Sequence, residues 1–210
     1  MSPTEIHSDE ELLGLAAAGE LAAFAALYER RQGGIYRFAL RMSGSESLAE
    51  DVTQDVFIAL IKDAGQFDPA RGSTVASYLY GMARNRVLRL LERDRSFIPM
   101  TEQASGDDDD PVHDRLIVRE DPLAELTRNE LVEAVRQSIL ALPIHYREVI
   151  ILCSLQEMSY AQAAEVLGCA VGTVRSRLHR ARELLVRKLE SVAEPERSPR
   201  VSACGDAYGM

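Results

Sequence analysis

Apolar residues recur at intervals of three and four along most of this chain, and no long stretch alternates apolar with polar residues. An interval of three or four places side chains on one face of an α-helix, whereas a half-buried strand needs an interval of two. The stretch 20–42 shows the helical interval in Leu21, Phe24, Leu27, Tyr28, Ile35, Phe38 and Met42. With 46% apolar residues the chain can bury a core, and the pattern predicts an all-α protein.

Three serines have the spacing of a capping box, in which the serine and a Glu or Gln three residues later each accept a hydrogen bond from the other's backbone N–H. The pairs are Ser8 with Glu11, Ser47 with Glu50, and Ser159 with Gln162. Each pair predicts the N-terminus of a helix. The consecutive glycines Gly33 and Gly34 predict a kink within the helix 20–42.

The predicted helices fall into two groups, separated by a stretch without helical periodicity. The first group occupies a domain at 1–95 and the second a domain at 122–190. Between them, 96–121 holds four consecutive aspartates and is predicted to be a flexible acidic linker. The tail 191–210 is predicted to be disordered. The expected fold is therefore two small helical domains joined by a linker.

The most specific local pattern is 159–182, which predicts a helix-turn-helix in the C-terminal domain. This motif needs a small residue where its helices cross, a turn glycine, and a branched apolar residue in the second helix. Ala164, Gly168 and Val174 meet these needs in that order. Gly168 can adopt a positive φ, which lets the chain reverse at little cost. The second helix is predicted to run from about 171 to 189.

The net charge of −9 conceals a segregation of charge along the chain. Residues 171–188 carry six basic residues against Glu183 alone, whereas 105–125 carries eight acidic residues against two basic ones. A local basic face can bind phosphate whatever the total charge. A solvated, arginine-rich face on an ordinary core helix has the same composition. Because the basic face coincides with the turn pattern, we favour a recognition helix that enters a DNA major groove.

Three segments together resemble a known family in their order and spacing. Residues 140–185 (LALPIHYREVIILCSLQEMSYAQAAEVLGCAVGTVRSRLHRARELL) resemble domain four of extracytoplasmic-function (ECF) sigma factors, and AEDVTQDVFIALIK (49–62) and SYLYGMARNRVLRLLERDR (77–95) resemble their domain two. The resemblance implies a subunit that directs core RNA polymerase to promoters, with 1–95 as domain two and 122–190 as domain four. It also implies that domain four reads the upstream −35 duplex. The candidate residues are Thr173, Arg175, Ser176, Arg177, His179 and Arg180.

By the same resemblance, the segment 77–95 and the loop before it bind the opened −10 strand and capture a base turned out of the duplex. A mixture of amide, aromatic and guanidinium groups suits single-stranded DNA, where bases stack and phosphates need neutralising. Many relatives carry a tryptophan where this chain has Tyr78, which keeps a stacking face and loses indole area. The candidate residues are Gln66, Tyr78, Arg84, Asn85, Arg86 and Arg89.

The segment 49–62 places polar residues and one isoleucine in a stripe opposite its apolar face. Such a stripe suits a protein partner, although an ordinary amphipathic surface helix has the same pattern. The resemblance implies that the stripe binds core RNA polymerase. The candidate residues are Asp51, Gln54, Asp55 and Ile58.

Two other function classes compete with this interpretation. A stand-alone DNA-binding regulator would use only the C-terminal domain and leaves 1–95 unexplained. An enzyme is disfavoured because the sequence has no nucleophile elbow, P-loop, HExxH helix or paired catalytic carboxylates. The three cysteines fit no metal or disulfide pattern, so we expect no metal and no cofactor.

The expected partners are core RNA polymerase, promoter DNA and, by the resemblance, an anti-sigma factor that holds the protein inactive. No apolar run is long enough to span a bilayer, and no signal peptide opens the chain. We therefore expect a cytoplasmic protein that does not insert into a membrane.

Overall fold

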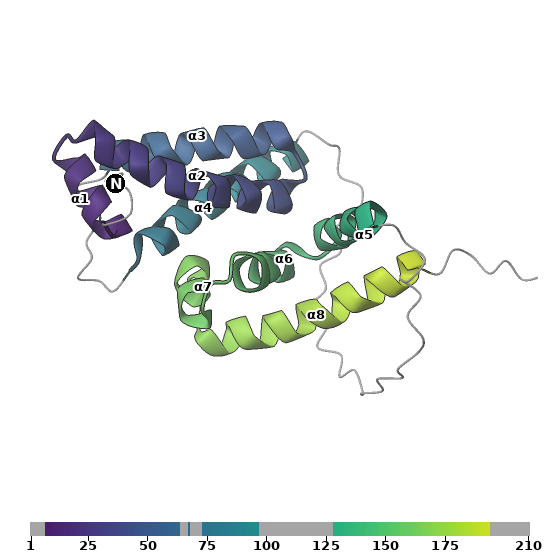
Figure 1. Cartoon of the computed structure of the whole chain (residues 1–210). Coiled ribbons are helices and arrows are strands. Elements are labelled where there is room, and N and C mark those ends of the chain that lie inside the picture. Colours follow the sequence, from purple (N-terminus) through teal and green to yellow (C-terminus); the bar gives the residue numbers. More distant parts are fainter. Residues whose placement is uncertain (1–6, 64–66, 68–72, 97–127, 194–210) are drawn as a thin grey trace, which may run out of the picture.

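The computed structural model describes residues 7–63, 67, 73–96 and 128–193 (Figure 1). Over these ranges the chain forms eight α-helices, one π-helical turn and no strand, which confirms the all-α prediction. Nearly all of the predicted linker 96–121, and the tail from residue 194, lie outside the described residues.

The N-terminal half is built from four helices, and its core lies between three of them. The helices are α1 (Asp9–Ala17), α2 (Leu21–Ser43), α3 (Glu46–Asp63) and α4 (Val75–Ser96). Helices α2, α3 and α4 pack against one another, and α1 packs across α2 and α4 (Figure 1). Leu27, Phe38, Val56 and Leu79 are completely buried between them. Their spacing along each helix is the one that predicted the helices.

Two acidic residues of α1 attach it to the other helices. The buried carboxylate of Asp9 accepts hydrogen bonds from Arg30, at 2.8 Å, and from Arg31, both on α2. The side chain of Glu10 accepts a bond from the backbone N–H of Val75, 3.1 Å away. Since the first N–H groups of a helix have no partner within it, Glu10 caps α4 from a different helix.

Two of the three predicted capping boxes are present. Ser8 with Glu11 begins α1, and Ser159 with Gln162 begins α7 (Tyr160–Leu167), each with both reciprocal hydrogen bonds. The box predicted at Ser47 is wrong, because α3 begins two residues earlier and the hydroxyl of Ser45 accepts the N–H of Leu48 at 3.3 Å. Ser45 follows the turn glycine directly and is therefore the first serine able to cap the helix.

The C-terminal half contains the remaining helices. They are α5 (Arg128–Leu140), α6 (Ile144–Ile150), the π-helical turn Ile151–Leu155, α7, and α8 (Val171–Ala193). Helix α8 packs against α5, α6 and α7, and it continues four residues beyond its predicted end at 189. In the π-helical turn the N–H of Gln156 donates to the carbonyl of Ile151 at 2.9 Å. The helix that begins as α6 thus ends as a wider turn.

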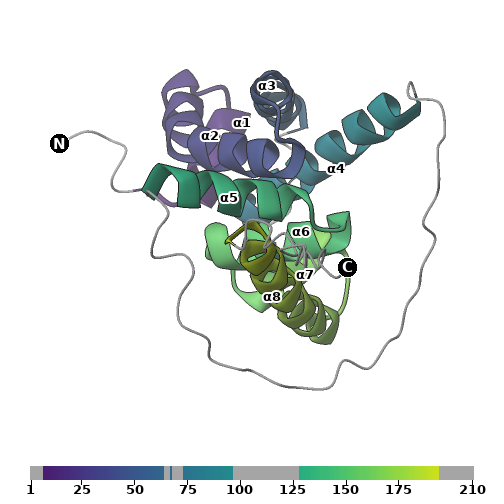
Figure 2. The same ribbon diagram turned by 90° about the vertical axis from the view of Figure 1, so that its right-hand side faces the viewer.

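The two halves pack against each other. Helix α5 lies along α2, and α7 lies against α4 (Figure 2). Buried apolar residues from both halves form one continuous cluster, which includes Phe38 and Tyr80 from the first half and Leu142 and Ile151 from the second. The sequence predicts two domains and says nothing of this contact.

Gly34 has a packing role at this contact. A Cβ atom at Gly34 would lie 2.8 Å from the hydroxyl of Tyr80 and 3.9 Å from Oε1 of Gln156. Helix α2 runs without interruption through Gly33 and Gly34, although the pair predicted a kink. The glycine therefore makes room for an aromatic side chain from α4.

Replacing Gly34 with Ala should destabilise the protein by about 1–3 kcal/mol, because the added methyl group overlaps the ring end of Tyr80, which cannot move without disturbing the core. Gly81→Ala is the matched control, since Gly81 lies within α4 and an added Cβ would meet nothing within 4 Å. Its expected effect is a gain of roughly 0.5–1 kcal/mol from helix propensity. Urea denaturation of both variants measures the difference, and equal stabilities would contradict this packing role.

Candidate nucleic-acid interface

The helix-turn-helix is formed by α7, the turn at Gly168–Ala170, and α8. Gly168 ends α7 with φ +64° and ψ +36°, the left-handed conformation expected for it. Ala164 and Val174 are buried where the two helices cross. The predicted geometry of this motif is confirmed. Helix α8 lies on the side of the molecule away from the N-terminal half, so its outer face is uncovered (Figure 1).

The outer face of α8 presents most of the predicted −35 residues. Arg175, Ser176, His179 and Arg180 are exposed, while Thr173 and Arg177 are half-buried.

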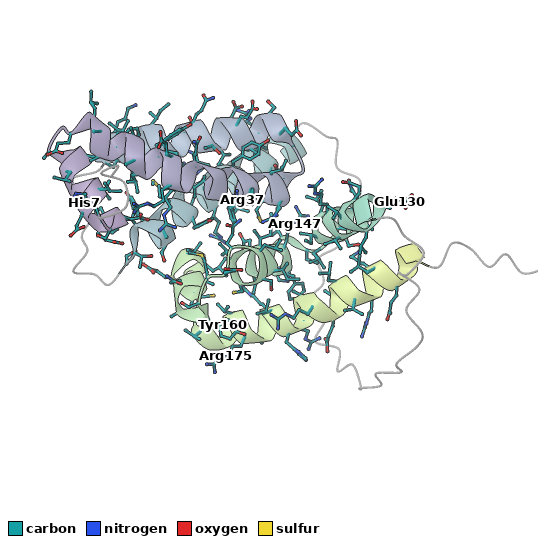
Figure 3. All side chains as sticks on the ribbon, in the orientation of Figure 1. His7, Arg37, Glu130, Arg147, Tyr160 and Arg175 are labelled. Carbon is teal, nitrogen blue, oxygen red and sulfur yellow. The ribbon has the colours of Figure 1, made fainter. Side chains whose placement is uncertain are left out.

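Two of these side chains are positioned by neighbours. The guanidinium carbon of Arg175 lies 5.9 Å from the ring centre of Tyr160, the first residue of α7 (Figure 3). An arginine over an aromatic face is attracted to it, so Tyr160 limits where the guanidinium can point. Nε2 of His179 lies 3.3 Å from a carboxylate oxygen of Glu183, one turn further along α8. The sequence pattern did not single out Tyr160.

His145 on α6 lies near Arg177 of α8. Burial lowers the pKa of His145 below its ordinary value, the positive charge of Arg177 lowers it further, and Glu148 acts in the opposite direction. The ring of Tyr146 lies next to it, with ring centres 4.1 Å apart. His145 is therefore biased toward its neutral form.

The residues predicted to bind the −10 strand point in different directions from α4. Asn85 and Arg89 are exposed and lie one turn apart. Tyr78 packs against Phe67, with ring centres 5.5 Å apart, and burial raises the pKa of Tyr78. Gln66 lies outside the described residues.

Two other arginines of this set are paired with acidic residues. Arg84 faces the C-terminal half, where its Nε lies 2.7 Å from Oε1 of Glu148 and its Nη2 lies 3.3 Å from Oε2. Arg86 lies 3.6 Å from a carboxylate oxygen of Asp55, one of the predicted polymerase residues on α3. The structure therefore does not bring the five described candidates together on one open face.

Helix α3, which carries the predicted polymerase stripe, lies on the side of the N-terminal half away from the C-terminal half (Figure 1). Asp51, Gln54 and Ile58 are exposed, and Asp55 is half-buried beside Arg86.

An apolar surface continues from this stripe. Ile61 is 57% exposed one turn after Ile58, and Leu21 at the start of α2 is 84% exposed. Leu21 and Ile61 line a groove of about 170 Å³ together with Phe24 and Leu60. Isolated exposed apolar residues are common, whereas a group of them around a groove is a candidate binding surface. The sequence could have indicated Ile61 through its i+3 spacing from Ile58, whereas the position of Leu21 depends on the packing of α2 on α3.

Within the ranges that the structure describes, no group of three or more His, Cys, Asp or Glu side chains could hold a metal ion. None of the described helices is both long and apolar enough to cross a membrane.

Comparison with known protein families matches both halves of the chain. Residues 27–97 match the model of Sigma-70 region 2, and residues 132–185 match the model of Sigma-70 region 4. The fold and the site thus define a bacterial-type RNA polymerase sigma factor that consists of these two regions.

Individual relatives specify the family. The chain is 30% identical over 178 residues to the ECF RNA polymerase sigma factor SigW of Bacillus subtilis, covering 83% of this chain and 92% of that protein. It is 32% identical over 183 residues to the ECF sigma factor SigM of Mycobacterium tuberculosis, covering 87% and 85%. The chain belongs to the ECF sigma factors, which direct RNA polymerase to promoters.

Solved structures agree with this assignment. CnrH, in complex with the cytosolic domain of CnrY, is 28% identical, with a TM-score of 0.63 over 87% of this chain and 97% of that one. The sigma factor RpoE of Bartonella quintana, in complex with the anti-sigma factor NepR, is 26% identical, with a TM-score of 0.55 over 76% and 91%.

The lowered pKa of His145 has a consequence for stability. Between the ordinary pKa of about 6.5 and the lower folded value, the unfolded chain binds a proton that the folded chain does not, so stability falls as the pH drops through this window. His145→Gln should remove part of that loss, as measured by thermal melts from pH 7 to pH 5. In NMR titrations of the folded proteins, the pKa of His145 should be higher in the Arg177→Ala variant than in the unchanged protein. A native pKa at or above 6.5 would contradict the assignment.

Proposed function

We propose that this ECF sigma factor contacts the two promoter elements and the polymerase through three separate surfaces. The observation that carries the proposal is the open basic face of α8, which is set on a turn of helix-turn-helix geometry within a chain that matches both sigma-70 regions. In this proposal domain two occupies 1–95 and domain four occupies 122–190. The linker between them is 96–121, and the tail is 191–210.

The exposed face of α8 reads the −35 duplex in this proposal. Arg175 and Arg180 supply donors for guanine edges or phosphates, and Ser176 and His179 supply short polar groups. Thr173 and Arg177, which are less exposed, lie at the margin of the face. The ring of Tyr160 supports Arg175 and restricts its direction.

The −10 strand binds along α4 in this proposal. Asn85 and Arg89 are exposed and ready to contact bases and phosphates. Tyr78 offers an aromatic face at the start of the helix, and Gln66 belongs to the preceding segment. Arg84 and Arg86 join this surface only when they leave their carboxylate partners.

Core RNA polymerase binds the outer face of α3 in this proposal. Asp51, Gln54 and Asp55 provide the polar contacts, and Ile58 provides an apolar one. The groove beside Ile61 and Leu21 extends the surface toward α1, where an apolar side chain of the polymerase can insert.

The proposed mechanism involves no covalent chemistry. Binding to polymerase raises the effective concentration of each promoter-reading domain for its element.

A polymerase subunit acts where the chromosome is transcribed, so we propose a cytoplasmic location for this protein. Because RpoE is solved with the anti-sigma factor NepR, and CnrH with the cytosolic domain of CnrY, we also propose an anti-sigma factor as a partner of this chain.

Run-off transcription on a pooled promoter library tests the promoter assignment. Adding the protein to purified core polymerase should create defined start sites. The double change Arg175→Ala with Arg180→Ala should reduce them by tenfold or more, since each good base contact contributes about 1–3 kcal/mol. Arg187→Ala is the matched control, because Arg187 is exposed on α8 but lies beyond the recognition face. A folded protein that neither binds core polymerase nor starts transcription would leave a stand-alone regulator as the better assignment.

The apolar surface on α3 gives a separate prediction. Ile58→Ser with Ile61→Ser should weaken binding to core polymerase by roughly 10-fold or more, because burying one such side chain contributes about 1.5–3 kcal/mol. Val186→Ser serves as control, since Val186 is 52% exposed on α8 and lies outside the proposed surface. Fluorescence titration of labelled protein with core polymerase measures both. If the control weakens binding as much as the double variant, the surface is wrongly placed.

A further inference from the structure

A small cavity collects arginine side chains between α2, α4 and the segment after the π-helical turn. It measures about 180 Å³, and its polar lining consists of Arg30, Arg31 and Arg37 from α2, Tyr80 from α4, and Gln156. Among the described residues, no Asp or Glu side chain lines it. Pockets for drug-sized ligands usually measure about 300–1,000 Å³, so this cavity suits a smaller ligand. Its three arginines favour a negatively charged one.

The positive charge around the cavity is only partly neutralised. Arg30 and Arg31 share the carboxylate of Asp9, which lies 2.8 Å from Nη1 of Arg30. Over the part of the chain that the structure describes, no carboxylate pairs with Arg37, or with Arg41 one turn further along α2. Like charges at this spacing on a helix repel each other. A bound anion offsets that repulsion.

The hydroxyl of Tyr80 shows that these charges converge. Burial raises the pKa of Tyr80, whereas the charges of Arg31, Arg37 and Arg41 act in the opposite direction. Burial lowers the pKa of Arg41, and the neighbouring charges of Arg37 and Arg136 lower it further. Guanidinium groups from three turns of α2 therefore act together on one phenol oxygen.

Two buried donors beside the cavity have no acceptor. The hydroxyl of Tyr80 donates to Oε1 of Gln156 at 2.7 Å, so the amide oxygen is engaged and the amide nitrogen is not. Nε2 of Gln156 and Nη1 of Arg41 are buried without a hydrogen-bond partner among the described residues. An unpaired buried donor is costly, because it has lost its bond to water and gained none in return. An oxyanion supplies the acceptors that this region lacks.

We propose that the cavity binds a small phosphate-bearing anion, either free phosphate or pyrophosphate or the terminal phosphates of a nucleotide. Arg37 supplies a charge that no carboxylate neutralises, and Gln156 supplies an unused amide donor. Arg30 and Arg31 are held in place by Asp9, so they lose little freedom when they bind. The planar donors of a guanidinium match the oxygens of a phosphate. The site goes beyond the proposed function, because none of these residues belongs to its three surfaces.

Isothermal titration calorimetry of the full chain tests the site, with sodium pyrophosphate as the probe. One pyrophosphate should bind per chain with saturation, and the melting temperature should rise with its concentration. Sodium chloride at the same ionic strength is the comparison, because general screening of the arginines also stabilises the protein. Equal stabilisation by both salts, without saturable heat, overturns the proposal.

Two variants locate the binding site. Arg37 is exposed, so Arg37→Gln should fold normally, and it should weaken pyrophosphate binding by about tenfold or more, as expected for the loss of a charge-assisted hydrogen bond. Gln156→Glu keeps the acceptor for the Tyr80 hydroxyl and places a negative charge among the arginines. It should abolish binding and raise the melting temperature in the absence of pyrophosphate. Arg187→Gln is the matched control, since Arg187 is exposed on α8, outside the cavity. Unchanged affinity in both variants, or an equal loss in the control, overturns the proposal.

The source of the phosphate group is identified by titrating inorganic phosphate, pyrophosphate and a nucleoside triphosphate in parallel. Tighter binding of either inorganic anion supports a free anion as the ligand, and tighter binding of the triphosphate supports a nucleotide. Failure of all three to bind overturns the site and leaves the proposed function intact, because run-off transcription tests that function through other residues.

Discussion

The pairing of Arg84 with Glu148 is the constraint on which the arrangement of the two domains depends. A carboxylate that is 2% exposed needs a cation with good geometry, because burying it alone costs several kcal/mol. Arg84 meets this need from the other domain, and Arg147, the residue before Glu148, donates to carbonyl groups of the last residue but one of α2 and the last residue of α5. Consecutive residues of the short helix α6 therefore attach it to both halves, and the turn that follows brings Gln156 to Tyr80.

Around this contact the molecule separates its functions by face. Helices α3 and α8 lie on opposite sides of the molecule. Helix α3 exposes polar and apolar residues, and α8 exposes basic ones. Helix α4 lies between them and is shared, since Arg86 is paired toward α3 and Arg84 toward α6. Because α4 has ion pairs on both sides, a change in how the two domains pack alters α4 more than any other helix. The net charge of −9 disfavours binding of the whole protein to random DNA. Binding to DNA then depends on local basic faces that the polymerase brings into position.

Much of the candidate site was predictable from the sequence because its determinants are local. The helix-turn-helix depends on Ser159, Ala164, Gly168 and Val174, all within sixteen residues, and the structure confirms the cap, the turn and the crossing. The capping box at Ser47 failed because two serines near one turn compete, and the pattern alone does not say which one lies at the boundary. The sequence pattern did not indicate Tyr160, because its role depends on a contact with Arg175. Arg175 lies fifteen residues later, on the other helix of the motif.

The sequence by itself determined the all-α class, the order of the helices and the faces of α3 and α8, because helical periodicity and capping act over a few residues. Only the tertiary structure decided that Gly34 makes room for Tyr80, that Leu21 joins Ile61 in one groove, and that Arg84 faces Glu148 instead of solvent. These features join residues up to 64 positions apart in the chain. No periodic pattern reports such a pairing, since it arises from how two amphipathic surfaces meet.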